Sequence, residues 1–81
     1  MEVFYAPHFK RSFKFLTKEV KKKFRKQIGF LLTDIRHPSL RAKKYDERRG
    51  IWQARVDRNC RFYFLIKGDA YILIEIKLHP K

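Results

Sequence analysis

Apolar positions recur along the chain with two different spacings. The first apolar run, Glu2–Tyr5, contains valine, phenylalanine and tyrosine and stops before Pro7, which predicts a strand. From Pro7 onward the spacing becomes helical, because Phe9, Phe13 and Leu16 recur among lysines and arginines. A proline suits the first turn of a helix, where its missing N–H is not needed. We therefore predict a short strand followed directly by a helix.

A second, longer helix is predicted after Thr17, which can serve as its N-cap. Its apolar positions form one stripe along the helix: Val20, Phe24, Ile28, Leu31, Leu32 and Ile35. The opposite face is rich in lysine, which is typical of a solvated helix face. His37-Pro38 ends the helix, because the residue before a proline disfavours the helical conformation. The two helices are expected to pack as a hairpin.

In the last third of the chain, apolar and polar residues alternate. Residues 51–56, 60–66 and 70–78 show this spacing of two, and the short links at 57–59 and 67–69 contain turn residues. The pattern predicts three consecutive antiparallel strands with one apolar face. The residues expected on that face are Trp52, Ala54, Val56, Cys60, Phe62, Phe64, Ile66, Ile72, Ile74, Ile76 and Leu78.

Together these elements predict an α+β fold in a single domain spanning residues 1–81. The order is β-α-α-β-β-β, with a two-helix hairpin packed on one face of a four-stranded, mainly antiparallel sheet. The connector, residues 36–50, is basic and has little periodicity, so no strand is predicted in it. A hydrophobic content of 44% supplies enough apolar material for one core in 81 residues.

The charge of the chain is strongly positive. Its 21 lysines and arginines outnumber 8 acidic residues, which gives a net charge of +13. A field of that sign attracts polyanions, and counterion release adds affinity for nucleic acid. No apolar run approaches the ~18 residues of a membrane-spanning helix, no signal peptide is visible, and a single cysteine excludes an internal disulfide. We therefore expect a cytoplasmic protein that acts on nucleic acid and not on a membrane.

The sheet face left open by the helices should collect polar and charged side chains. By alternation it carries Gln53, Arg55, Arg61, Tyr63, Glu75, Lys77 and His79. Arginine matches phosphate oxygens with two hydrogen bonds and histidine titrates near neutral pH, so the combination suits phosphate binding and proton transfer. Five cations of the connector can flank the same surface: Arg41, Lys43, Lys44, Arg48 and Arg49. Taken singly, each of these residues also fits an ordinary solvated surface.

Metal and cysteine chemistry are not expected. Cys60 falls on the apolar face, which makes it a small core residue. His8 and His37 stand beside prolines near the ends of elements and have no evident ligand partners. Because no close set of carboxylates could hold Mg²⁺, cleavage of a phosphodiester by this chain would have to proceed without a metal, and no cofactor is implied.

The element order and three short motifs resemble the RelE/ParE toxin superfamily. The motifs are G-x-W-x-x-R-V from residue 50, C-R-F-Y-F-L-I from residue 60 and I-L-I-E-I-K-L-H from residue 72. The family typically has an arginine in the first strand of the meander, the pattern y-R-h-h-Y in the next, and a basic residue or histidine at the end of the last. RelE-like members are ribosome-dependent endoribonucleases, and ParE-like members inhibit DNA gyrase.

The resemblance implies a type II toxin that cuts mRNA on the ribosome and is restrained by an acidic antitoxin. It assigns the scissile phosphate to Arg61 and the role of general acid to His79, and it leaves the general base open. Arg55 and Lys77 would position the RNA strand. The remaining candidates would contact mRNA or ribosomal RNA: Gln53, Tyr63, Arg41, Lys43, Lys44, Arg48 and Arg49.

The antitoxin is expected to neutralise the cationic face and to cover apolar side chains there, such as Leu65, Tyr71 and Leu73. Two other functions stay open, a ParE-like gyrase inhibitor that cleaves nothing and a degenerate toxin-like module that only binds RNA. The sequence departs from the YoeB-like nuclease pattern at two places: Pro80 stands where that branch has a terminal tyrosine, and Ala42 lies near the place of its glutamate base.

Overall fold

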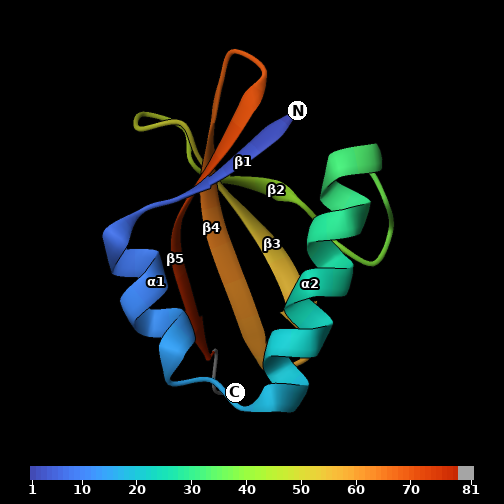
Figure 1. Cartoon of the computed structure of the whole chain (residues 1–81). Helices are drawn as coiled ribbons and strands as arrows, with labels where there is room; N and C mark the ends of the chain where they lie inside the picture. Colours follow the sequence, from blue (N-terminus) through green and yellow to red (C-terminus); the bar gives the residue numbers. More distant parts are fainter. Residues whose placement is uncertain (79–81) are drawn as a thin grey trace.

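The computed structural model describes residues 1–78, so His79, the expected general acid, lies outside the described residues. The elements in chain order are β1 (Glu2–Tyr5), α1 (Pro7–Lys14), α2 (Lys18–Thr33), β2 (Lys43–Asp46), β3 (Ile51–Asp57), β4 (Cys60–Lys67) and β5 (Ala70–Leu78). The strands form one sheet in the order β1-β5-β4-β3-β2, in which only β1 and β5 pair in parallel. Figure 1 shows α1 beside β5 and α2 beside β3. The α+β fold predicted from the sequence is confirmed.

The ends of the helices follow the local sequence closely. α1 begins at Pro7, as predicted, and Thr17 caps α2 by accepting the backbone N–H of Val20 at 3.2 Å. α2 ends at Thr33, two residues before the end of the predicted stripe, because Asp34 has an extended backbone. The Asp34 carboxylate then accepts the N–H of Arg36 at 2.9 Å, which turns the chain into the connector.

The core lies between the helices and the apolar face of the sheet. Aromatic rings dominate the contact: Phe24 of α2 meets Phe9 of α1 and Phe62 of β4, each with ring centroids 5.4 Å apart. Phe62 and Phe64 are fully buried. Cys60 is also fully buried, and burial raises the pKa of its thiol to about 11, which confirms that it is a core residue and disfavours a nucleophilic thiolate.

The sheet has five strands, so the expected count of four is wrong. The additional strand is β2, which lies within the connector and pairs antiparallel with β3 through Lys43 opposite Gln53 and Lys44 opposite Trp52. β2 is an edge strand of four residues whose side chains are mostly exposed. A short, lysine-rich edge strand has no buried face, and it therefore lacks the apolar alternation by which strands are recognised in a sequence.

The apolar face of β5 is also not the predicted one. Phe64 of β4 pairs with Leu73 while Tyr63 pairs with Glu75, so Ile74 is an extra residue that forms a β-bulge. A bulge reverses the side-chain alternation on one side of it. Tyr71 and Leu73 are therefore buried, at 6% and 0% exposure, whereas Ile72 and Ile74 lie on the opposite face.

Two residues expected on the apolar face are only loosely covered. Ile66 and Leu78 lie near the ends of β4 and β5 and are 39% and 59% exposed. The expectation that Tyr71 and Leu73 are exposed is wrong for the reason just given, while Leu65 is half-buried on the open face.

Candidate anion-binding site on the open sheet face

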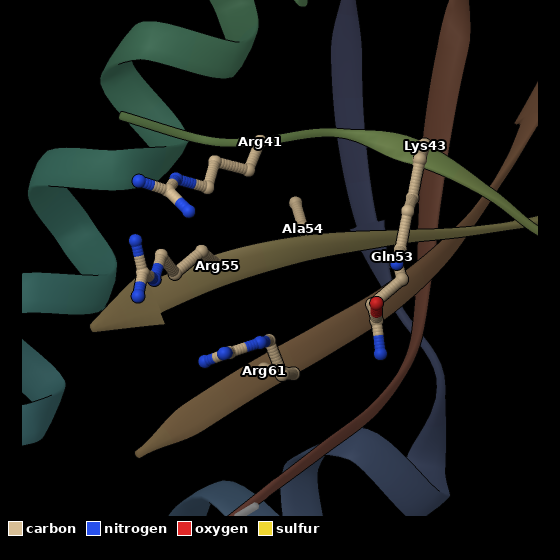
Figure 2. A pocket seen from close by; sticks show the side chains of 6 residues that line it. All are labelled: Arg41, Lys43, Gln53, Ala54, Arg55 and Arg61. Carbon is tan, nitrogen blue, oxygen red and sulfur yellow. The ribbon is translucent and has the colours of Figure 1, made fainter. Parts of the chain in front are cut away.

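A hollow of about 320 Å³ lies over β2, β3 and β4 on the open face of the sheet (Figure 2). Its lining residues are Arg41, Lys43, Gln53, Ala54, Arg55 and Arg61. Four of these six are cations, and the lining contributed by residues 1–78 contains no carboxylate. We name this the cationic hollow, and its charge suits an anion.

The register of the sheet explains why arginines from different strands meet. Arg55 pairs directly with Arg61, and Arg61 pairs with Lys77, so these three residues form one row across β3, β4 and β5. A second row, two residues away, joins Lys43 to Gln53 and Gln53 to Tyr63. Like charges directly opposite each other on a sheet destabilise it.

Arg41 reaches the hollow from the connector just before β2. Its backbone has a left-handed conformation, with φ 47°, which is uncommon outside glycine. The preceding residue anchors it, because Leu40 is fully buried and its carbonyl accepts the backbone N–H of Arg55 at 2.7 Å. Figure 2 shows the resulting arrangement, in which the guanidinium of Arg41 lies next to that of Arg55.

The connector is fixed from its other side by α2. Gln27, a buried polar residue, donates hydrogen bonds to the carbonyls of Arg55 at 2.7 Å and of Ser39 at 3.0 Å. The Ser39 hydroxyl donates in return to the Gln27 side chain at 3.1 Å. The backbones that carry Arg41 and Arg55 are therefore held by a satisfied buried network.

The guanidinium of Arg55 lies in an electrostatically unfavourable environment. Burial lowers the pKa of its guanidinium, and the neighbouring charges of Arg41 and Arg61 lower that pKa further. Its buried Nε atom has no hydrogen-bond partner among residues 1–78. Arginine nevertheless stays protonated at neutral pH. An unpaired buried donor beside repelling cations is a local arrangement that a bound anion would stabilise.

The guanidinium of Arg61 already donates hydrogen bonds within the protein. Its Nη1 atom donates to the carbonyls of Asp57 at 2.7 Å, Cys60 at 3.1 Å and Arg58 at 3.3 Å, which fixes the turn between β3 and β4. The guanidinium also borders the hollow (Figure 2). The turn thus orients a charged group that can hold an anion from one side.

Tyr63 lies on the open face as expected but is covered there. It is only 4% exposed. Its hydroxyl accepts a hydrogen bond from Gln53 Nε2 at 3.0 Å, the ring of Tyr45 lies 4.9 Å away, and Lys77 Nζ is 5.5 Å from the ring centroid. The ring of Tyr45, which covers Tyr63, is 55% exposed, and no pattern in the sequence selected it.

Glu75 turns away from the arginines and binds α1. Its carboxylate accepts hydrogen bonds from His8 Nε2 at 2.7 Å and Ser12 Oγ at 3.0 Å, and also from the backbone of Ile76 at 2.9 Å. Burial raises the pKa of Glu75, but the hydrogen bonds to its carboxylate outweigh burial, and the pKa is lowered. Glu75 therefore ties α1 to β5.

The other predicted cations lie outside the hollow. Lys77 borders it from the next strand and is exposed. Lys44 lies with its Nζ 5.4 Å from the ring of Trp52, which packs against the core, so it belongs to the helix side of the sheet. Arg48 and Arg49 are exposed in the turn after β2, where Arg49 pairs with Asp46 at 2.7 Å.

No group of three histidine, cysteine, aspartate or glutamate side chains within residues 1–78 is placed to hold a metal ion. In the same part of the chain, no helix is long and apolar enough to span a bilayer.

The sequence matches no protein-family model and no curated protein. Several solved structures nevertheless superpose on almost the whole chain. A YoeB/ParE toxin from Agrobacterium tumefaciens is 14% identical, with a TM-score of 0.82 and coverage of 99% of this chain and 100% of that one. RelE in the RelB-RelE antitoxin-toxin complex of Methanococcus jannaschii is 17% identical, with a TM-score of 0.76 and coverage of 93% and 88%.

The heterotetrameric YoeB-YefM toxin-antitoxin complex of Staphylococcus aureus gives a third match, at 13% identity, a TM-score of 0.79 and coverage of 99% and 98%. These likenesses extend over most of the length of both chains and agree with the element order described above. The chain has the fold of the RelE/ParE toxin superfamily.

Proposed function

We propose that this protein is the toxin of a type II toxin–antitoxin pair and that it cleaves ribosome-bound mRNA. The observation that carries the proposal is the cationic hollow, in which Arg41, Arg55 and Arg61 lie together and the buried Nε of Arg55 has no hydrogen-bond partner within residues 1–78. Three guanidiniums from three separate segments suit a phosphodiester, because each can make paired hydrogen bonds with phosphate oxygens.

The proposed reaction is attack of a ribose 2'-oxygen on the adjacent phosphorus. A 2'-O–P bond forms and the P–O5' bond breaks, which gives a 2',3'-cyclic phosphate and a 5'-hydroxyl. Arg61 and Arg55 would hold the non-bridging oxygens and stabilise the charge that develops on them, while Lys77 neutralises the neighbouring backbone. His79 would give a proton to the leaving 5'-oxygen.

The lining that residues 1–78 provide contains no carboxylate and no imidazole. In this proposal the hollow therefore acts by binding and by charge stabilisation, and the acceptor of the 2'-hydroxyl proton comes from outside it. The exposed Arg48 of the connector would contact ribosomal RNA, where recognition depends on backbone and 2'-hydroxyl groups.

An acidic antitoxin is part of the proposal. RelE of Methanococcus jannaschii and YoeB of Staphylococcus aureus form complexes with antitoxins. On this chain, an antitoxin segment would neutralise the cationic hollow and cover the apolar part of the open face. That part consists of Leu65, Ile72 and Ile74, together with Phe4 of β1, which is 51% exposed.

A second candidate function is inhibition of DNA gyrase without cleavage. It is favoured by the absence of a proton acceptor from the lining within residues 1–78, and the Agrobacterium tumefaciens match is described as a YoeB/ParE toxin. The two candidates differ in what an expressing cell accumulates, since one produces new mRNA 5' ends and the other produces DNA damage.

The test is to map mRNA 5' ends in cells after expression of the protein is induced. The same mapping is done in vitro, with purified ribosomes that carry mRNA and to which the purified protein is added. We expect cuts within translated codons for the wild type. Arg61→Ala and His79→Ala should lower the cleavage rate by about 10²-fold or more, as is usual for a lost charge-stabilising group or general acid. Lys22→Ala, on the exposed face of α2, is the control and should cut at nearly the wild-type rate.

The proposal fails if the wild type produces no new mRNA ends. It also fails if Arg61→Ala and His79→Ala both keep native circular dichroism and cut at the full rate. Loss of gyrase supercoiling activity in the presence of purified protein would support the second candidate instead.

A further inference from the structure

A second hollow, of about 270 Å³, lies on the same open face beyond Tyr63. Its lining differs in kind from that of the cationic hollow. The walls include two aromatic rings, Tyr45 and Tyr63, and two aliphatic side chains, Ile51 and Ile74. Two cations, Arg49 and Lys77, and the carboxylate of Glu75 stand at its margin. Flat apolar walls with a charged margin suit a planar, partly polar ring.

Tyr45 is in this position because of a bulge in β2. Lys44 pairs with Trp52 and Asp46 pairs with Ile51, so Tyr45 is the extra residue and has no partner in the ladder. Its side chain is 55% exposed. The ring is held edge-on against Tyr63, with centroids 4.9 Å apart and planes at 66°. One face of an exposed aromatic ring is thus oriented in advance, with the buried Tyr63 as its support.

The floor of this hollow depends on the bulge in β5. Ile74 is the extra residue of that strand, which places it on the open face together with Ile51 and not in the core. Both isoleucines are half-buried. The bulge in β2 therefore supplies the aromatic wall of the second hollow, and the bulge in β5 supplies its apolar floor.

The two hollows are neighbours. Gln53 lines the cationic hollow and donates its amide to the Tyr63 hydroxyl, which borders the second one. Arg61 and Tyr63 are two residues apart on β4, a separation of about 7 Å along an extended strand. A phosphate held at Arg61 and a ring held beside Tyr45 are therefore close enough to belong to one nucleotide or to adjacent ones.

We propose that the second hollow binds one unpaired nucleobase of the RNA whose phosphate occupies the cationic hollow, stacked on Tyr45. The inference rests on the proposed function, because it assumes an RNA ligand, and it adds which residue receives a base. Stacking on an aromatic ring tolerates every base, since each has a π-face. Tyr45 should therefore add affinity without strong base selection.

The experiment compares two labelled hexamers by fluorescence anisotropy with the full chain. One is a 2'-O-methyl oligoribonucleotide, which cannot undergo attack by its 2'-oxygen. The other carries the same number of phosphates but abasic sugars. The wild type should bind the base-containing hexamer about 10- to 100-fold more tightly than the abasic one.

Tyr45→Ala should remove most of that difference, and Tyr45→Phe should keep it, because the ring is retained. Arg55→Ala should weaken the binding of both hexamers alike. If Tyr45→Ala leaves the preference for bases intact, or weakens both hexamers equally, the base site is overturned and the phosphate site stands. If the wild type binds neither hexamer, the proposed RNA substrate fails together with the base site.

Discussion

Arg55 illustrates a residue whose folded environment favours a ligand over stability. It lies opposite Arg61 in register, next to Arg41, and its buried Nε donor is unpaired among residues 1–78. Repulsion between these charges opposes folding, and the phosphate of the proposed RNA substrate would relieve it. Removal of the charge of Arg55 should therefore raise the free energy of unfolding and weaken the binding of RNA.

Arg55→Met tests this directly. Methionine keeps most of the unbranched side-chain stem but removes the charge, so we expect the free energy of unfolding of the free protein to rise. Cleavage of ribosome-bound mRNA should fall by about 10²-fold. Urea titration and primer extension measure the two effects. Lys22→Met, on the exposed face of α2, is the matched control, and a less stable Arg55→Met variant with full activity would contradict the argument.

At the scale of elements, the carboxylate of Glu75 adds hydrogen bonds to the packing of α1 against the sheet. β1 pairs only with residues 70–73 of β5, and α1 packs against β5, where Glu75 accepts hydrogen bonds from His8 and Ser12. The pKa of Glu75 is lowered from 4.5 on folding. A carboxyl with a lowered folded pKa contributes stability above its unfolded pKa and loses it as the pH falls through the folded value.

We therefore expect the urea midpoint of the wild type to fall as the pH drops below about 4.5. Glu75→Gln should be less stable than the wild type at pH 7 and should show a smaller loss on acidification, because it has no proton to gain. Glu47→Gln, in the exposed turn after β2, should follow the wild type across the same range. Parallel pH curves for the wild type and Glu75→Gln would rule out this contribution.

Elements with a buried face could be predicted from the sequence, and elements without one could not. The helices, the three-strand meander and the buried Cys60 follow from periodicity, because each has a face committed to the core. β2 has no such face. Ile74 fits the alternation of β5 in the sequence, and only the pairing with β4 shows that it is a bulge residue.

The candidate site shows the same division between local and non-local information. The pairing of Arg55 with Arg61 follows from alternation in neighbouring strands joined by a short turn. Arg41 and Lys43 could be proposed only as flanking cations, since their place in the hollow depends on a left-handed residue and on β2. Tyr45 had no signal in the sequence because a bulge, and not a pattern, brings it to the open face.

The whole molecule carries a net charge of +13 in a chain with a radius of gyration of 11.7 Å. A rise in salt concentration should therefore weaken the electrostatic contribution to the binding of an acidic antitoxin. The apolar contact over Leu65 and Ile72 should persist. We expect the dissociation constant, measured by titration calorimetry, to rise at least tenfold between 0.1 and 1 M NaCl, where screening shortens the Debye length from about 10 to 3 Å. Co-expression of the antitoxin should restore growth.

A tight complex whose affinity is the same at both salt concentrations would argue against a cationic interface. Arg41→Ala serves as an internal check, because it removes one charge from the hollow and should reduce the salt dependence. Lys22→Ala removes the same charge from the far side of α2 and should leave the salt dependence almost unchanged.

The parallel pairing of β1 with β5 has a consequence for the way this chain is made. Residues 2–5 cannot enter the sheet until residues 70–73 exist, so the contact with the greatest sequence separation forms late and lowers the folding rate. The β3–β4 hairpin can form earlier, but its core face stays open until β5 arrives. Until β5 has been synthesised, the chain therefore exposes the apolar face of β3 and β4, and a translation inhibitor built this way would lack its complete sheet up to that point.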